Sequence, residues 1–90
     1  MVETEASLFH WRDRDGAKVD IVLERPNGLV VGIEVKAVFD LSAGDSKGLR
    51  SLRGRLGDAF VCGVVLHCGD RVQRLDERIF ALPVSSLWST

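Results

Sequence analysis

The chain has 90 residues, of which 46% are hydrophobic and 28% are charged, and its formal net charge at pH 7 is −1. A chain of this length and composition folds as one small domain, which excludes an intrinsically disordered protein. With so little net charge, binding to nucleic acid must depend on a local group of basic side chains, and the lack of a long apolar run excludes a membrane-spanning helix.

The first half of the chain is predicted to form an antiparallel meander of three strands. Residues 1–7 are polar and are expected to be frayed. Runs rich in Val, Ile, Phe and Trp, separated by turn residues, then predict strands over 8–12, 18–24 and 29–39.

A crossover unit follows the meander. Leucines at helical spacing predict a helix over residues 46–58, with Asp45 or Ser46 as its N-cap and Gly57 at its far end. Residues 59–68 are almost all apolar, which is typical of a central strand buried on both faces. Because a helix connects this strand to the preceding one, the two strands are predicted to be parallel.

Two short strands, over 71–76 and 78–84, and a final helical turn complete the prediction. The fold class is therefore α/β, with a mixed sheet, one crossover helix and a short β tail. The only cysteines are Cys62 and Cys68, too few for a disulfide scaffold, so we expect a cytoplasmic protein with free thiols.

The lengths of the two turns decide which side chains of the meander face one another. Each turn contains either two residues (Asp15-Gly16 and Asn27-Gly28) or three, with Arg14 or Pro26 added. The hydrophobic pattern favours three, because a two-residue turn at Asn27-Gly28 mixes polar and apolar side chains on each face. In the three-residue register Asp20 lies opposite Glu34 on one side and opposite His10 on the other. The apolar residues then share the opposite face: Phe9, Trp11, Val19, Ile21, Val31, Ile33 and Val35.

This register has a chemical consequence. Two carboxylates directly opposite each other repel, and Lys36, two residues after Glu34, relieves part of that repulsion. A divalent cation relieves more, since Mg²⁺ binds one or two carboxylates and keeps several waters. Lys36 would then position or deprotonate a water for attack on a phosphodiester. The alternative is a solvated row of charges on the exposed side of a sheet, which contributes little to stability.

The spacing Asp20-x13-Glu34-x-Lys36, together with the predicted order of elements, resembles the PD-(D/E)xK nuclease-like superfamily. More closely, the chain is similar over about residues 8–88 to an uncharacterised C-terminal domain that follows AAA-type ATPase modules in bacterial and archaeal proteins. Five segments carry this similarity in order: HWRDRDGAKVDIVLE, GIEVKA, DSKGLRSL, GVVLHCGD and ALPVSSLW.

The resemblance implies a restriction-endonuclease-like core and a role for each matching residue. It implies that Asp20, Glu34 and the backbone carbonyl of Val35 bind Mg²⁺ or Mn²⁺, and that Lys36 assists the nucleophilic water. It also implies that the chain is part of a longer protein containing an AAA-type ATPase module.

Two departures from the family pattern affect the site. Relatives of the ATPase-linked kind carry an acidic residue two positions before the aspartate, where this chain has Lys18. The superfamily also has a helix before the first strand, often with another acidic ligand. Only seven residues precede Leu8 here, and Glu3 or Glu5 would have to supply that ligand.

Further candidate residues surround this site. His10 is a possible proton carrier beside Asp20, or simply a polar residue on the exposed side of a strand. The basic residues of the predicted helix are candidate contacts to DNA phosphates, although a solvated helix face explains them equally well: Lys47, Arg50, Arg53 and Arg55.

Two functions follow. The first is a metal-dependent nuclease-like domain that acts on or binds DNA. The second is a non-catalytic accessory or interaction domain of an ATPase that keeps the nuclease-like fold. In either case the lack of a first helix would leave the apolar face with Phe9 and Trp11 bare, and we expect a second copy or a segment of the parent protein to cover it.

Overall fold

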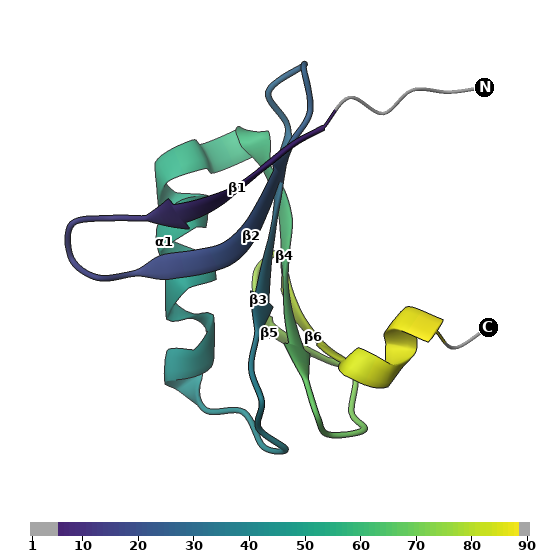
Figure 1. Cartoon of the computed structure of the whole chain (residues 1–90). Helices are drawn as coiled ribbons and strands as arrows, with labels where there is room; N and C mark the ends of the chain where they lie inside the picture. Colours follow the sequence, from purple (N-terminus) through teal and green to yellow (C-terminus); the bar gives the residue numbers. More distant parts are fainter. Residues whose placement is uncertain (1–5, 89–90) are drawn as a thin grey trace.

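In the computed structural model, which describes residues 6–88, one sheet carries a single α-helix on one face and a short terminal 3₁₀ turn on the other (Figure 1). The sheet has six strands in the order β1-β2-β3-β4-β6-β5. Their bounds are β1 Ser7–Arg12, β2 Lys18–Glu24, β3 Val30–Val35, β4 Phe60–His67, β5 Gln73–Asp76 and β6 Ile79–Pro83. The helical segments are η1 Ala43–Ser46, α1 Lys47–Leu56, η2 Gly57–Ala59 and η3 Val84–Trp88.

The predicted α/β class and strand directions are confirmed. Strands β1, β2 and β3 form the antiparallel meander, and β3 pairs parallel with β4 across the connection through α1. The β tail joins the same sheet, because β6 pairs parallel with β4 and β5 lies outside β6. The predicted N-cap Ser46 and the predicted end at Gly57, which has φ 59°, also agree with the structure.

Both three-residue turns are confirmed. The N–H of Asp13 donates to the carbonyl of Ala17, and the N–H of Arg25 donates to the carbonyl of Leu29. Each turn ends in a glycine with positive φ, 90° at Gly16 and 88° at Gly28. This conformation costs a glycine little, and it is what the three-residue hairpin turn requires.

The core lies between α1 and the sheet. Leu49 and Leu52 of α1 pack against fully buried side chains of the strands, among them Val19, Val22 and Phe60. Gly32 lies directly beneath the helix, because a Cβ built there would be 2.8 Å from Leu49 Cδ2. The small residue therefore allows the helix to approach the sheet closely.

Three predictions about boundaries and faces were wrong. Strand β3 ends at Val35 rather than at residue 39, and the α-helix covers 47–56 because 3₁₀ turns form its flanks. The predicted grouping of Phe9, Trp11 and Val19 with the apolar residues of β3 also fails. The β1–β2 register shifts between Phe9 and Trp11, where two residues of β2 face one residue of β1.

This bulge changes which face each β2 residue occupies. Val19, only 1% exposed, contacts the core beside α1, and Trp11 pairs with it and packs against the same core. Phe9 pairs with buried Val22 on this same side. In a regular antiparallel ladder the side chains alternate strictly between the two faces. The extra residue therefore places Phe9, Trp11 and Val19 on the face opposite to the one predicted for them.

Candidate functional site

Asp20 and Glu34 meet where the backbone pairing of β2 with β3 ends. The ladder runs from Glu24–Val30 to Ile21–Ile33. Beyond it, the N–H of Asp20 donates to Glu34 Oε1 at 2.8 Å, and the N–H of Val35 donates to Asp20 Oδ2 at 2.9 Å. The bulge explains why side chains, and not backbone carbonyls, accept these two hydrogen bonds, because it turns the β2 backbone before Asp20 away from β3. Two side chains take the place of carbonyl acceptors.

Glu34 is the buried member of the pair. It is 3% exposed and lies on the α1 side of the sheet, and its Oε2 is 3.5 Å from Lys36 Nζ. Burial raises the pKa of Glu34, and the charge of Asp20 adds to this, whereas the N–H of Asp20 and the ammonium of Lys36 lower it. The structure therefore brings together the predicted Asp20, Glu34 and Lys36.

Asp20 is more accessible, with a side chain 33% exposed. Its Oδ1 lies 3.9 Å from the ammonium of Lys18, the residue that replaces the acid expected from the resemblance. Each carboxylate oxygen of Asp20 and Glu34 thus has one partner within the protein. Because a carboxylate oxygen has two lone pairs, each of these oxygens can in chemical terms accept a second partner.

The backbone carbonyl of Val35 points toward β2. The N–H of Lys36 donates to the carbonyl of Leu66 on β4. In a trans peptide the C=O and N–H point in opposite directions, so the carbonyl of Val35 points away from β4 and toward β2. The carbonyl of Val35 therefore lies on the β2 side of β3, the side on which the hydrogen bonds between Asp20 and Glu34 and between Val35 and Asp20 form.

This donor set suits a hard divalent cation in its chemistry. Two carboxylates and one carbonyl, completed by waters, are ligands typical of Mg²⁺. Across residues 6–88 the structure contains no group of three or more His, Cys, Asp or Glu side chains that could hold a metal ion, so the candidate donor set consists of two carboxylates and one backbone carbonyl. Glu3 and Glu5, the candidates for an extra ligand, lie outside the described residues.

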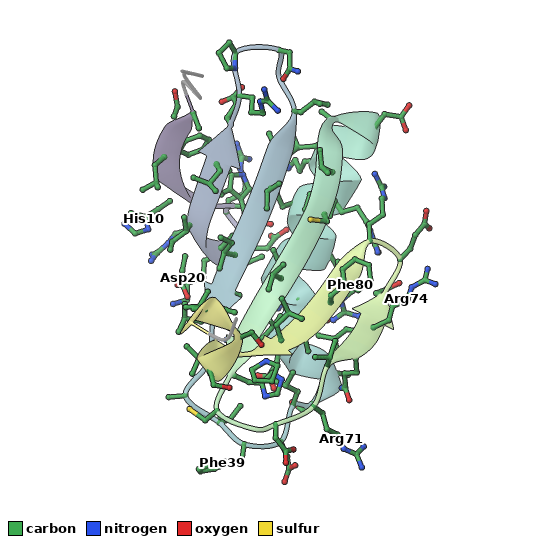
Figure 2. The ribbon with its side chains drawn as sticks, turned by 90° about the vertical axis from the view of Figure 1, so that its right-hand side faces the viewer. His10, Asp20, Phe39, Arg71, Arg74 and Phe80 are labelled. Atoms are coloured by element: carbon green, nitrogen blue, oxygen red, sulfur yellow. The ribbon has the colours of Figure 1, made fainter. Side chains whose placement is uncertain are left out.

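His10 contacts Asp20 through the backbone. His10 Nδ1 lies 2.7 Å from the carbonyl oxygen of Asp20. A carbonyl only accepts hydrogen bonds, so Nδ1 carries the proton and Nε2 is the basic nitrogen of the neutral ring. Figure 2 shows His10 and Asp20 at the same margin of the sheet. His10 thus contacts the backbone of Asp20, and because Phe9 and Trp11 on either side of it face α1, its side chain lies on the opposite face of β1.

A cavity of about 150 Å³ borders the site on the α1 side. It is lined by Glu34 and Lys36 from the end of β3 and by Lys47 and Gly48 from the start of α1. Gly48 allows this approach, because a Cβ there would overlap the carbonyl oxygen of Lys18. Among the helix residues predicted to contact DNA, Lys47 is thus the one that shares this cavity with Glu34.

The other basic residues of α1 do not form one free row. Arg53 donates to the carbonyl of Glu77 at 2.7 Å and pairs with Asp76 at 3.3 Å, and Arg50 donates to the carbonyl of Ala43. Arg55 is exposed. Arg50 and Arg53 therefore bond to other segments of the chain, whereas Lys47 and Arg55 are exposed.

A second cavity, of about 440 Å³, lies at the carboxyl ends of β3 and β4, and no sequence pattern pointed to it. Phe39, Asp40 and Arg71 line it, together with His67, which is 4% exposed. The N–H of Gly69 donates to His67 Nδ1, and Nε2 lies 2.9 Å from the carbonyl of Arg71. Both ring nitrogens are thus used to shape the loop, and the histidine is structural.

Comparisons with known proteins give one result that bears on identity. The model of a family described as a domain of unknown function, DUF4143, matches residues 2–87. No curated protein and no solved structure matches the chain. No helix within residues 6–88 has the length and apolar character needed to cross a membrane.

Proposed function

The chain belongs to the DUF4143 family of domains of unknown function, and we propose that it is a nuclease-like domain that binds a divalent cation and acts on DNA. The observation that supports the proposal is that hydrogen bonds join Asp20 to Glu34 and Val35 to Asp20 beside an ammonium group. The N–H of Asp20 donates to Glu34, the N–H of Val35 donates to Asp20, and Lys36 Nζ lies 3.5 Å from Glu34 Oε2. The proposal includes a restriction-endonuclease-like core for the mixed sheet.

Each residue has a distinct task in this proposal. The N–H of Val35 fixes the carboxylate of Asp20, and the N–H of Asp20 fixes that of Glu34, so both ligands are oriented before a cation arrives. Bound Mg²⁺ or Mn²⁺ would stabilise the charge that develops on a phosphate and would make a nearby water more acidic. Lys36, released from part of its attraction to Glu34, would hold that water or a phosphate oxygen.

The wider partners follow from the accessible cations and from the resemblance. Lys47 borders the same cavity as Lys36, and Arg55 is exposed on the same helix, so both are proposed to contact DNA phosphates. The similarity to domains that follow AAA-type ATPase modules is the reason for proposing that the domain works beside such a module in a parent protein.

A specific observation favours a second candidate, a non-catalytic accessory domain of an ATPase. Each carboxylate oxygen of the pair already has a partner, and the bonds join β2 to β3 where the ladder stops. Hydrogen bonds and ion pairs of this kind stabilise the sheet without any cation. The same residues would then be retained for folding.

A plasmid-cleavage assay with Mg²⁺ and with Mn²⁺ distinguishes the two candidates. If the domain is a nuclease, wild type and Asp15→Asn, a change in an exposed turn, cleave the DNA, whereas Asp20→Asn and Lys36→Ala do not. Intact plasmid after incubation of wild type with either cation supports the accessory domain. Equal cleavage by all four proteins refutes the assignment of these residues, because another site or another protein must then be responsible.

A further inference from the structure

The two edges of the sheet differ in their protection against pairing with another strand. Strand β5, at one edge, has four residues and a register shift between Arg74 and Asp76, and Arg74 Nε donates back to the carbonyl of Asp76. Short, irregular and charged edge strands are the usual means of preventing strand addition. Figure 2 shows Arg74 at this margin and His10, of β1, at the other.

Strand β1 lacks these protections. It has six residues, SLFHWR, without proline or lysine. The extra residue of the neighbouring bulge belongs to β2, so β1 itself keeps the regular alternation of a strand that can accept a partner. An edge of this kind is a template for another strand.

The free backbone groups of this edge can be assigned. The N–H of Asp13 donates to the carbonyl of Ala17 in the first turn. In an antiparallel pair, alternate residues bond to the neighbour, so the odd-numbered residues of β1 face β2. The N–H and C=O groups of Leu8, His10 and Arg12 therefore point away from the sheet.

Apolar side chains flank this edge on both faces. Leu8 is 69% exposed, and Phe9, which pairs with Val22 on the α1 side, is 40% exposed. A large aliphatic and an aromatic side chain beside unpaired backbone groups match the composition of an interface better than that of a solvated edge.

We infer that β1 pairs antiparallel with β1 of a second copy of the chain, so that two sheets join into one across a two-fold axis. A second copy fits because one antiparallel contact satisfies both free edges at once and closes as a dimer. The partner strand then presents the same alternation of apolar side chains on each face.

The register of this contact follows from which groups face outward. With the two-fold axis at Phe9, Leu8 lies opposite the partner's His10, and both residues have outward-pointing backbone groups. Phe9 then lies opposite the partner's Phe9, an aromatic cross-strand pair of the stabilising kind. Among the other registers that preserve the faces, the one centred on His10 opposes two histidines instead.

Sedimentation velocity over a micromolar concentration series tests the inference. Wild type is expected to shift from monomer to dimer, and Phe9→Lys to remain monomeric, because two ammonium groups would face each other. Phe80→Lys is the matched control, since Phe80 is 37% exposed and lies on β6 beside the other edge. Wild type that stays monomeric throughout, or Phe9→Lys that dimerises like Phe80→Lys, overturns the proposal.

Disulfide trapping tests the register separately and does not depend on the lysine variant. In a Cys62→Ser, Cys68→Ser background, Phe9→Cys is expected to form a covalent dimer on mild oxidation, visible on a non-reducing gel. Leu8→Cys should not, because its partner position is His10. Efficient trapping of His10→Cys with none of Phe9→Cys contradicts the Phe9-centred register.

Discussion

The backbone N–H of Asp20 donates to the side chain of Glu34 at 2.8 Å, so two acidic residues of neighbouring strands are joined through a backbone hydrogen bond. The bond closes the end of the β2–β3 ladder and orients the Glu34 carboxylate. Folding and the proposed cation binding thus depend on the same atoms.

Removing the charge of Glu34 should stabilise the fold at neutral pH. Burial raises the pKa of Glu34 above its ordinary value of 4.5. A folded-state pKa above the unfolded value means that the stabilising contribution is complete below the unfolded pKa and is lost as pH rises through the folded pKa. Glu34→Gln keeps an oxygen for the N–H of Asp20 and should unfold at a higher temperature than wild type at pH 7, with the difference shrinking toward pH 4.

Thermal unfolding followed by circular dichroism from pH 4 to pH 7 measures this difference. Glu77→Gln is the control, because the Glu77 side chain is 72% exposed. A Glu34→Gln difference that stays constant with pH would mean that the buried charge does not weaken the fold.

Two glycines of α1 should respond to alanine in opposite directions. A Cβ added at Gly54 would meet no atom within 4 Å apart from its chain neighbours and the backbone of its own helix, so Gly54→Ala should stabilise the protein by about 1 kcal/mol through helix propensity. At Gly48 the Cβ would meet the carbonyl of Lys18, and overpacking of this kind costs about 1–3 kcal/mol. Urea unfolding of both variants is the measurement, and equal effects at the two positions would contradict the close approach of α1 to β2.

Asp76 should stabilise the fold in a pH-dependent way. The N–H of Glu77, at 2.7 Å, and the guanidinium of Arg53 lower the pKa of Asp76. A lowered pKa gives a contribution that is present above the unfolded value and lost as pH falls through the folded value. Asp76→Asn should therefore lower the melting temperature at pH 7, with the gap closing below about pH 4. Asp58→Asn, an exposed change, should have little effect at either pH.

The basic residues of α1 should separate into two groups in a DNA-binding assay. Lys47→Ala and Arg55→Ala should weaken binding and reduce the slope of log affinity against log salt by about one unit each. Arg53→Ala should instead lower the melting temperature, because Arg53 bonds to Glu77 and Asp76. Fluorescence anisotropy with a labelled duplex measures the slopes, and an equal loss from all three variants would contradict this division.

The sequence predicted the strand directions and the turns because these depend on local chemistry. Pro26-Asn27-Gly28 specifies its own turn, and a continuous apolar run predicts a buried parallel strand wherever it occurs. The meeting of Asp20 with Glu34 followed from those turns, and the structure brings the two residues together.

The bulge and the close approach of α1 could not be predicted in this way. The extra residue in β2 depends on how β2 pairs with both of its neighbours, which the sequence of one strand does not encode. The segment KVDIVLE alternates as a regular strand would, and only the burial of Val19 in the structure reveals the bulge. Helix propensity alone treats Gly48 and Gly54 alike, whereas the contact with Lys18 distinguishes them. The use of Arg53 as a tie to Asp76 depends on a strand 23 residues away along the chain.

A magnesium titration followed by amide NMR tests the central claim most directly. The amides of Asp20 and Val35 donate to the two proposed ligands, so both signals should shift and saturate in the millimolar range in wild type and fail to do so in Asp20→Asn. If neither amide responds to Mg²⁺, or if both respond equally in Asp20→Asn, the two carboxylates join β2 to β3 and do not form a cation site.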